Sequence, residues 1–275
     1  MQHTQAADNS VTQNDSINQN DNTPRITQAM ILAAGKGTRL RPLTLTTPKP
    51  LVAVGGQPLI VWHIKALKAA GITDITINSS WLSDKLIAAI GDGSDYGVNI
   101  YWSVEDEPLE TAGGIAQALA TEKLKQAPFI LINGDVWSDI DLATLTQHQL
   151  QPDQQAHLLL IDNPAHNPEG DFGLDRGYAT FEPKASEALE QTQSTQLTKF
   201  TFAGISVIAP SLVAEVAQGE VAALAPLLKQ AMSNRKVTAD VLQAQWVDVG
   251  TVERLEQVNT SIEQQGAAET HPGRP

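Results

Sequence analysis

From residue 28 onward, short apolar runs alternate with stretches in which apolar positions recur every three or four residues. The first pattern is typical of buried strands and the second of amphipathic helices. Their alternation predicts βαβ units, and therefore an open α/β sheet flanked by helices. Strands are expected at 28–33, 72–78, 98–104, 129–133, 157–162, 204–208 and 246–249, and helices at 58–70, 81–90, 113–124, 141–150, 224–232 and 251–264.

The pattern predicts one domain over residues 28–263. Residues 1–27 are rich in Gln, Asn, Asp, Thr and Ser, and residues 264–275 carry Gly, Pro and small side chains, so both ends are expected to be disordered tails. The polar stretch 163–198 is broken by Pro and Gly, which predicts a long functional insertion or lid.

Composition narrows the classes of function. The 275-residue chain has no cysteine, which excludes disulfides, thiolate nucleophiles and cysteine-ligated metal centres. A formal net charge of -13 argues against nucleic-acid binding, because that affinity depends on Lys and Arg neutralising phosphates. No apolar run has the length of a membrane span or of a signal-peptide core, so we expect a cytoplasmic protein with no membrane contact.

Charge is unevenly distributed along this acidic chain. No Asp or Glu occurs between Asp21 and Asp74, whereas Lys36, Arg39 and Lys49 lie in that window. A local basic zone suits either a small phosphorylated ligand or an ordinary solvated surface.

A glycine-rich segment, AAGKGTRLRPLTLTTPK at 33–49, follows the first expected strand. Gly35 and Gly37 would let the backbone approach a triphosphate, and Arg39 and Lys49 would offset its charge. The segment lacks the Walker pattern, and Leu40 stands where the dinucleotide-binding fingerprint needs its third glycine. The sequence therefore predicts a different kind of phosphate loop.

The full segment resembles the signature of the sugar-1-phosphate nucleotidyltransferase family. Further matching motifs are TPKPLV (47–52), GDGS (91–94), LETAGGI (109–115), NGDVW (133–137), GDF (170–172), TFAGIS (201–206) and WVDVGT (246–251). The resemblance implies a Rossmann-like mixed sheet flanked by helices, of the GT-A-like type. It also implies Mg²⁺-dependent transfer of a nucleotide to a sugar 1-phosphate, with release of pyrophosphate.

Within the family, these motifs are most similar to the uridylyltransferase branch that uses UTP and N-acetylmuramate 1-phosphate in bacterial cell-wall sugar recycling. Two alternatives stay open. One is activity on glucose, mannose or glucosamine 1-phosphate, with UTP, dTTP or GTP. The other is a catalytically inactive relative that binds nucleotide sugars and regulates a partner.

The resemblance also assigns roles to single residues. Arg39 and Lys49 are the expected electrostatic catalysts, and no protein base is expected because a phosphate monoester is already nucleophilic at neutral pH. The expected nucleotide-binding residues are Ala34, Gly35, Gly37, Thr38, Arg39, Lys49, Asn78, Gly113 and Gly114.

Asp135 and Asp248 each end an expected strand and are the Mg²⁺ ligands that the resemblance implies. Taken alone, each is better explained as a turn or cap residue, and only the resemblance favours the metal role. For the sugar phosphate, the expected contacts are Glu110, Asn133 and Asp171.

Hexose-1-phosphate relatives carry a mid-chain Glu-Lys-Pro motif whose lysine meets the sugar phosphate. Here the corresponding region has the GDF motif at 170–172, and the EPK sequence at 182–184 has a different order. Structural roles are expected for Trp62 and His63, which lie in an expected amphipathic helix, and for His157 and His166, because no His-x-x-x-His spacing occurs.

Overall fold

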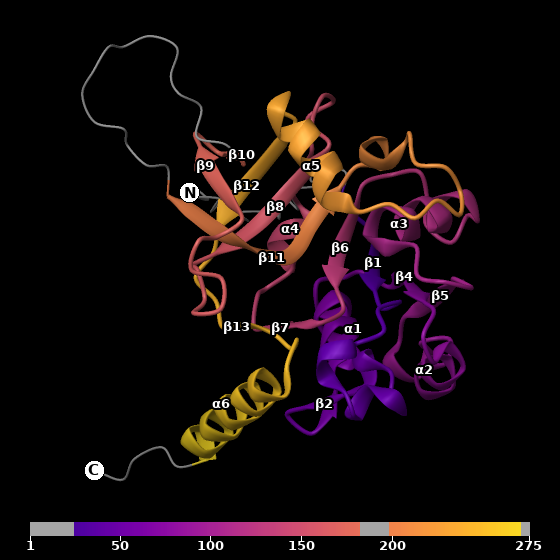
Figure 1. Cartoon of the computed structure of the whole chain (residues 1–275), viewed down its shortest axis with the longest axis vertical. Helices are drawn as coiled ribbons and strands as arrows, with labels where there is room; N and C mark the ends of the chain where they lie inside the picture. Colours follow the sequence, from indigo (N-terminus) through magenta and orange to yellow (C-terminus); the bar gives the residue numbers. More distant parts are fainter. Residues whose placement is uncertain (1–24, 182–197, 271–275) are drawn as a thin grey trace, which may run out of the picture.

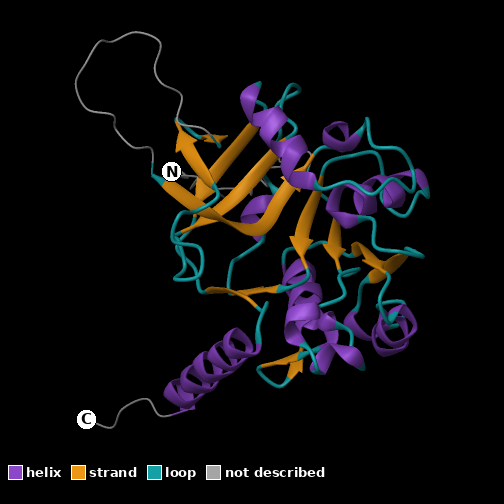
Figure 2. Cartoon of the chain, in the orientation of Figure 1, coloured by secondary structure: helices purple, strands orange, loops and turns teal. Residues whose placement is uncertain are grey.

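The computed structural model describes residues 25–181 and 198–270. Its centre is a nine-stranded mixed sheet with helices on both faces (Figures 1 and 2). In spatial order the strands are β5 (Asn99–Val104), β4 (Asp74–Ser79), β1 (Gln28–Leu32), β6 (Phe129–Asn133), β11 (Lys199–Ile208), β8 (Ala156–Ile161), β12 (Val237–Val241), β10 (Tyr178–Thr180) and β9 (Phe172–Asp175). The predicted α/β fold class is confirmed.

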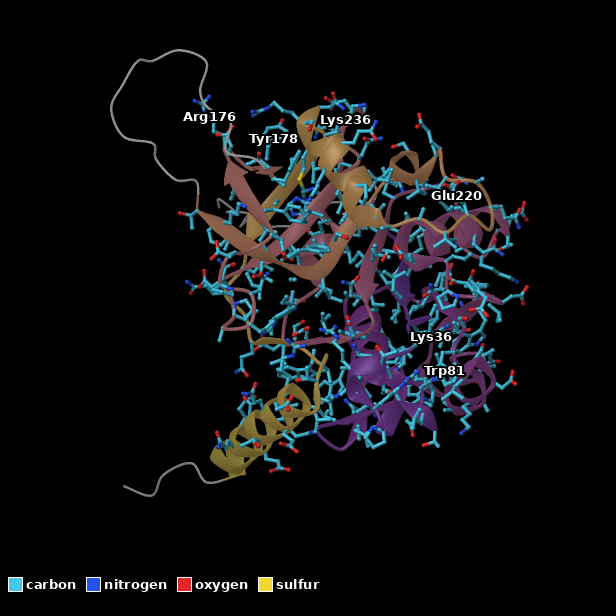
Figure 3. All side chains as sticks on the ribbon, viewed as in Figure 1. Lys36, Trp81, Arg176, Tyr178, Glu220 and Lys236 are labelled. Atoms are coloured by element: carbon cyan, nitrogen blue, oxygen red, sulfur yellow. The ribbon has the colours of Figure 1, made fainter. Side chains whose placement is uncertain are left out.

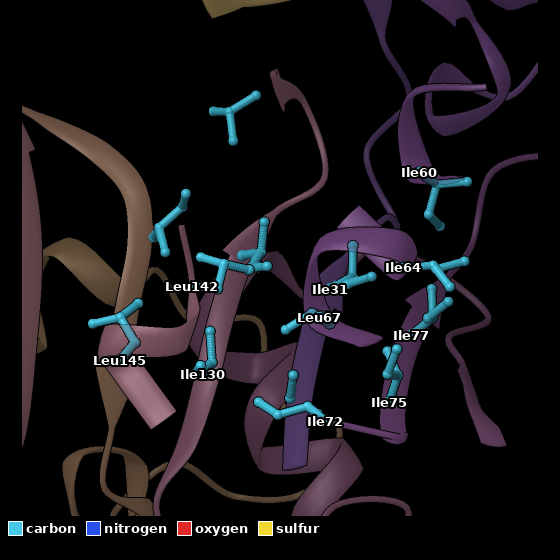
Figure 4. Packing of buried hydrophobic residues seen from close by; sticks show 14 of the residues in the cluster. Ile31, Ile60, Ile64, Leu67, Ile72, Ile75, Ile77, Ile130, Leu142 and Leu145 are labelled. Carbon is cyan, nitrogen blue, oxygen red and sulfur yellow. The ribbon is translucent and has the colours of Figure 1, made fainter. Parts of the chain in front are cut away.

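Side chains on alternate sides of each strand form two cores. Ala29 and Ile31 of β1 face the core that packs under α1 and α2, whereas Met30 faces the core under α3 and α5 (Figure 4 shows the first of these). This period of two is what a sheet buried on both faces requires. The helices are α1 (Leu59–Ala69), α2 (Ser83–Ile90), α3 (Glu110–Ala120), α4 (Ala143–Thr146), α5 (Leu224–Ser233) and α6 (Val252–Thr270).

The order of the strands determines where a ligand can bind. β1 lies between β4 and β6 and is parallel to both, with Leu32 opposite Asn78 on one side and Asn133 on the other. The carboxyl ends of three strands therefore meet at one edge of the sheet. In open α/β sheets, this edge is the usual binding site.

Two small two-stranded antiparallel sheets complete the fold. β7 (Val136–Ser138) pairs with β13 (Trp246–Asp248), and β2 (Ala53–Val54) pairs with β3 (Gln57–Pro58). Helix α6 lies beside them at one end of the molecule (Figure 1) and shares a third apolar cluster with them. This cluster contains Val52, Val54, Leu59, Trp137, Val249, Leu255 and Val258.

Several elements differ from the prediction. The helix expected at 141–150 is only Ala143–Thr146, because the Thr146 carbonyl accepts the Ile26 N–H and His148 turns to stack on His157. The stretch 163–198 contains the hairpin β9–β10, and its residues 182–197, with the EPK sequence, lie outside the described residues.

The last helix is longer than predicted. The sequence predicts that it ends at 264 and is followed by a tail, but α6 continues to Thr270. Residues 1–24 and 271–275 lie outside the described residues. No helix within the part of the chain that the structure describes is long and apolar enough to cross a membrane.

Candidate active site

The loop after β1 is held in a compact shape by its own side chains. Gly37 has a left-handed backbone, with φ 59°, and a Cβ there would lie 2.9 Å from Thr44 Cγ2. The Thr44 hydroxyl donates to the Gly37 carbonyl at 2.7 Å, and the Trp81 indole donates to the Thr44 carbonyl at 3.0 Å (Trp81 is labelled in Figure 3). Gly35 has open space where a Cβ would be, so its backbone is accessible to a ligand.

Lys49 and Asp135 form an ion pair in this edge of the sheet. Lys49 Nζ donates to Asp135 Oδ2 at 2.8 Å, and the lysine side chain is only 12% exposed. Gly134 brings Asp135 close to β1: its N–H donates to the Leu32 carbonyl at 2.9 Å, and a Cβ would lie 2.4 Å from the same oxygen. Glycine at 134 is therefore a steric requirement of the site.

Asp248 is brought to Asp135 by the pairing of β13 with β7. Asp248 lies opposite Val136, and the Val249 N–H donates to the Asp135 carbonyl at 2.7 Å. The carboxylate is flanked by two cationic or N–H side chains: His166 Nε2 lies 3.0 Å and Arg254 Nη1 3.1 Å from Asp248 Oδ1. The predicted pair of carboxylates thus meets in space, although Asp248 belongs to the small sheet and not to the main one.

Two cavities meet at Asn133 and Asp135. The first, of about 430 Å³, is large enough for a nucleotide. It is lined by Leu32, Ala33, Ala34, Gly35, Gly37, Thr38, Arg39, Lys49, Pro50, Asn78, Pro108, Glu110, Thr111, Asn133, Gly134, Asp135 and Gly250. The second, of about 300 Å³, is lined by Asn133, Asp135, Val136, His166, Asn167, Asp171, Thr201, Phe202, Gly204, Trp246 and Asp248.

The cavities bring most of the sequence-derived residues together. The phosphate-loop residues, Lys49 and Asn78 line the first cavity, and Glu110 and Asn133, expected at the sugar, line it too. Asp171 lines the second, where its Oδ2 accepts the Phe202 N–H at 2.8 Å. Glu110 has a left-handed backbone, with φ 59°, a strained conformation that is common at functional sites.

Gly113 and Gly114 lie in α3, and neither is among the residues that line the two cavities. A Cβ on Gly113 would lie 2.2 Å from the Glu220 carbonyl oxygen. One on Gly114 would lie 2.7 Å from Asn78 Nδ2 and 2.8 Å from Glu105 Oε1. The geometry supports packing roles for both glycines in place of the nucleotide-binding roles expected from the sequence.

Asn78 is part of a buried hydrogen-bond relay. Its Oδ1 accepts the Ala33 N–H at 2.8 Å, and its Nδ2 donates to Glu105 Oε1 at 2.7 Å. Glu105 Oε2 accepts the Leu109 N–H at 2.9 Å, and burial raises the pKa of this carboxyl. The Asn78 side chain therefore fixes the start of the phosphate loop at Ala33, and Glu105 in turn fixes the Asn78 side chain.

This relay gives a first prediction. Replacing Glu105 by Gln places an amide donor against either the Leu109 N–H or the Asn78 amide, and a buried donor left unpaired costs about 1–3 kcal/mol. We expect the affinity for a nucleoside triphosphate, measured by calorimetry, to fall roughly 5- to 100-fold while the protein stays folded. Asp106→Asn, at the exposed neighbouring position, should leave the affinity unchanged; equal affinities for both variants would refute the relay.

Sequence reasoning missed two side chains that line the second cavity, His166 and Asn167, and a third, Arg254, that contacts Asp248 from outside it. His166, given a structural role by default, lies against Asp248 with its ring nearly parallel to that of Trp246, at an interplanar angle of 17°. Asn167 Nδ2 lies 3.2 Å from Asp171 Oδ1 and 3.1 Å from the Thr201 hydroxyl. Arg254 reaches the site from α6, and only its spacing six residues after Asp248 could have indicated it.

The residues present fit a Mg²⁺ ion that is completed by substrate oxygens. Among the described residues no group of three or more His, Cys, Asp or Glu side chains is arranged to hold a metal. Asp135 and Asp248 supply hard oxygen ligands and both line the second cavity; Asp248 Oδ1 is buried beside His166 and Arg254, which leaves Oδ2 for a metal. Mg²⁺ is commonly held by one or two carboxylates together with substrate phosphates and water.

The whole described domain matches a known family. Residues 28–265 match the nucleotidyl transferase family. The chain belongs to this family. This membership confirms the resemblance to sugar-1-phosphate nucleotidyltransferases that the motifs indicate.

Individual relatives of this nucleotidyl transferase differ in substrate. The chain is 47% identical to an N-acetylmuramate alpha-1-phosphate uridylyltransferase of Neisseria meningitidis, over 84% of this chain and 96% of the relative. It is 30% identical to a mannose-1-phosphate guanyltransferase of Schizosaccharomyces pombe, over 81% of this chain and 61% of that relative. The longer yeast protein is thus matched over only part of its length.

Solved structures confirm the fold. A Bacillus anthracis structure described as a glucose-1-phosphate thymidylyltransferase superposes with a TM-score of 0.70 at 22% identity, over 86% of this chain and 95% of the other. HddC from Yersinia pseudotuberculosis superposes with a TM-score of 0.65 at 20% identity, over 86% and 99% of the two chains.

Proposed function

We propose that this chain transfers UMP from UTP to N-acetylmuramate 1-phosphate. The products are UDP-N-acetylmuramate and pyrophosphate, and the reaction serves the cytoplasmic recycling of cell-wall sugars. The observation that carries the choice of substrates is the 47% identity to the Neisseria uridylyltransferase over nearly its whole length. The choice of reaction is supported by Lys49, Asp135 and Asp248 meeting where the two cavities join.

In the proposed reaction, an oxygen of the sugar phosphate attacks the α-phosphorus of UTP. A new P–O bond forms, the bond from the α-phosphorus to the bridging oxygen breaks, and pyrophosphate leaves with that oxygen. The sugar phosphate is already ionised at neutral pH, so the protein mainly positions the reactants and stabilises charge. Lys49 and Arg39 offset the negative charge of the phosphates in the first cavity.

Asp135 and Asp248 would hold Mg²⁺, which supplies charge neutralisation on the phosphates when it is bound. The Asn78 relay keeps the phosphate loop in place, and Asn133 and Asp171 provide polar groups to the sugar. Asp171 accepts the Phe202 N–H through Oδ2 and the Asn167 amide through Oδ1, and these contacts orient its carboxylate in the cavity where the sugar would bind.

The test is a matrix of substrates. Pyrophosphate release is measured with Mg²⁺ for UTP, dTTP and GTP, each with N-acetylmuramate, N-acetylglucosamine, mannose and glucose 1-phosphate. We expect UTP with N-acetylmuramate 1-phosphate to exceed every other pair. A preference for GTP with mannose 1-phosphate would replace these substrates and keep the reaction, whereas no release with any pair would support the inactive nucleotide-sugar-binding alternative.

A further inference from the structure

Arg254 is a buried cation that the proposed reaction does not use directly. It lies in the first turn of α6, its side chain is 12% exposed, and it does not line either cavity among the described residues. Its Nη1 lies 3.1 Å from Asp248 Oδ1. Burial of an arginine is costly unless an anion compensates it, so this contact needs an explanation.

The local chain is shaped to allow this contact. Arg254 folds back over the backbone of Gly250, and a Cβ at 250 would lie 2.2 Å from Arg254 Nη2 and 3.0 Å from Asp248 Oδ2. Gly250 does not have a left-handed backbone, since it is absent from the positive-φ glycines. The space it leaves for the guanidinium is therefore the reason for glycine here.

The arrangement also orients the Asp248 carboxylate. Arg254 and His166 both lie beside Oδ1, whereas Oδ2 lies on the side of Gly250, which lines the first cavity. Oδ1 thus contacts two protein side chains, which leaves Oδ2 as the oxygen that Asp248 can offer to the second cavity, which it lines. Such partners behind a metal ligand set its orientation and charge.

The backbone that carries Arg254 is fixed by contacts outside the site. The neighbouring Leu255 and the nearby Val258 belong to the apolar cluster shared with Val54 and Trp137. The Asn259 side chain accepts the Gly55 N–H at 2.7 Å, which ties α6 to the β2–β3 hairpin. Helix α6 therefore gives Arg254 a rigid support.

Unpaired polar atoms of Arg254 and Asp248 also support a role for the contact between them. Arg254 Nε and Nη2, like Asp248 Oδ1, are buried without a hydrogen-bond partner in suitable geometry among the described residues. Buried unpaired donors are costly, so the ion pair with Asp248 is the interaction that compensates the buried guanidinium. We infer that Arg254 is a positioning residue that holds Asp248 in the orientation required to bind the divalent metal; the inference rests on the metal site of the proposed function.

The test measures metal binding without catalysis. Mn²⁺ binding in the presence of saturating UTP, and with no sugar phosphate, is followed by electron paramagnetic resonance of free Mn²⁺. We expect Arg254→Gln to weaken Mn²⁺ binding about 10- to 100-fold, the range typical of residues that support metal ligands, and Arg254→Lys to recover part of the loss. UTP binding in EDTA should be unchanged in both variants.

Two controls separate the possible failures. Lys229→Gln removes an exposed positive charge from α5 and should bind Mn²⁺ like the wild type, which excludes a general effect of net charge. Asp248→Asn should weaken binding at least as much as Arg254→Gln. If Asp248→Asn weakens binding and a folded Arg254→Gln binds within twofold of wild type, the inference is wrong and the metal site stands.

If Asp248→Asn binds Mn²⁺ normally, the proposed metal site fails and the inference fails with it. If Arg254→Gln does not fold, as judged by circular dichroism, Arg254→Lys decides the question because it retains the charge. A folded Arg254→Lys with unchanged Mn²⁺ affinity would then overturn the positioning role, since a lysine cannot reproduce the guanidinium that covers Gly250.

Discussion

Replacing Asp135 by Asn is expected to lower kcat/KM for nucleotidyl transfer on the order of 10³-fold, because loss of metal-based charge stabilisation is worth several kcal/mol. The substitution keeps the shape of the side chain but removes an anionic ligand. It also leaves Lys49, which is 12% exposed, without its counter-ion at 2.8 Å. The measurement is pyrophosphate release with UTP, Mg²⁺ and the preferred sugar 1-phosphate.

The matched control is Asp153→Asn, which removes one negative charge from an exposed turn. It should leave kcat/KM unchanged. Turnover of Asp135→Asn within about threefold of the wild type would exclude Asp135 as a metal ligand, since even residues that only support metal ligands typically contribute 10- to 100-fold.

The second large effect concerns acid stability. His63 in α1 is fully buried, and this burial lowers its pKa from 6.5 to about 4, despite the opposing Asp135 charge and a hydrogen bond with the Val136 backbone. The unfolded chain binds a proton at this residue below pH 6.5 and the folded chain does not. The contribution of uncharged, buried His63 to the free energy of unfolding is therefore fully present above pH 6.5 and is lost as the pH falls toward 4.

The expected loss from His63 alone is about 2 kcal/mol at pH 5 relative to pH 7.5. Urea unfolding at both pH values measures it. His63→Gln, which stays uncharged and keeps an N–H donor, should make the difference between the two pH values smaller by that amount. Ile64→Val, a neighbouring core change, should lower stability equally at both pH values, and a pH dependence unaltered in His63→Gln would contradict the assignment.

His157 adds to the same acid sensitivity. Burial, and then the charge of His148, lower its pKa to about 4, while Asp240 acts in the opposite direction. The two histidine rings are stacked with centroids 3.7 Å apart, so protonating both would place two positive charges in contact. His157 therefore has the structural role expected from the sequence, in a pair that the sequence did not indicate.

Local signals explain what the sequence predicted well. The ends of β1, β6 and α1 follow from apolar runs and from Gly71, whose left-handed backbone, with φ 87°, stops the helix. The phosphate loop is equally local, since its glycines and basic residues are consecutive. Its lining of the first cavity follows directly from its place after a strand.

Long-range contacts explain what the sequence missed. Nothing near Asn78 in the chain indicates that its Oδ1 accepts the Ala33 N–H and that its Nδ2 donates to Glu105, so the sequence predicts only a nucleotide-binding role for a residue that also supports the loop. Position 114 requires glycine because a Cβ there would collide with Asn78 and Glu105 of the same relay, a contact that only the fold reveals. His166 reaches Asp248 across 82 residues, a separation at which spacing rules for metal ligands have no force.

The pairing of β7 with β13 joins an early and a late segment of the chain, so the site is completed late during synthesis. Asp135 and Lys49 leave the ribosome long before Asp248, and the helix that steadies Asp248 is translated later still. A nascent chain can thus present the phosphate loop and all nine strands of its main sheet before the second carboxylate is made. Nucleotide turnover is therefore expected to begin only once Asp248 and α6 have emerged from the ribosome and docked.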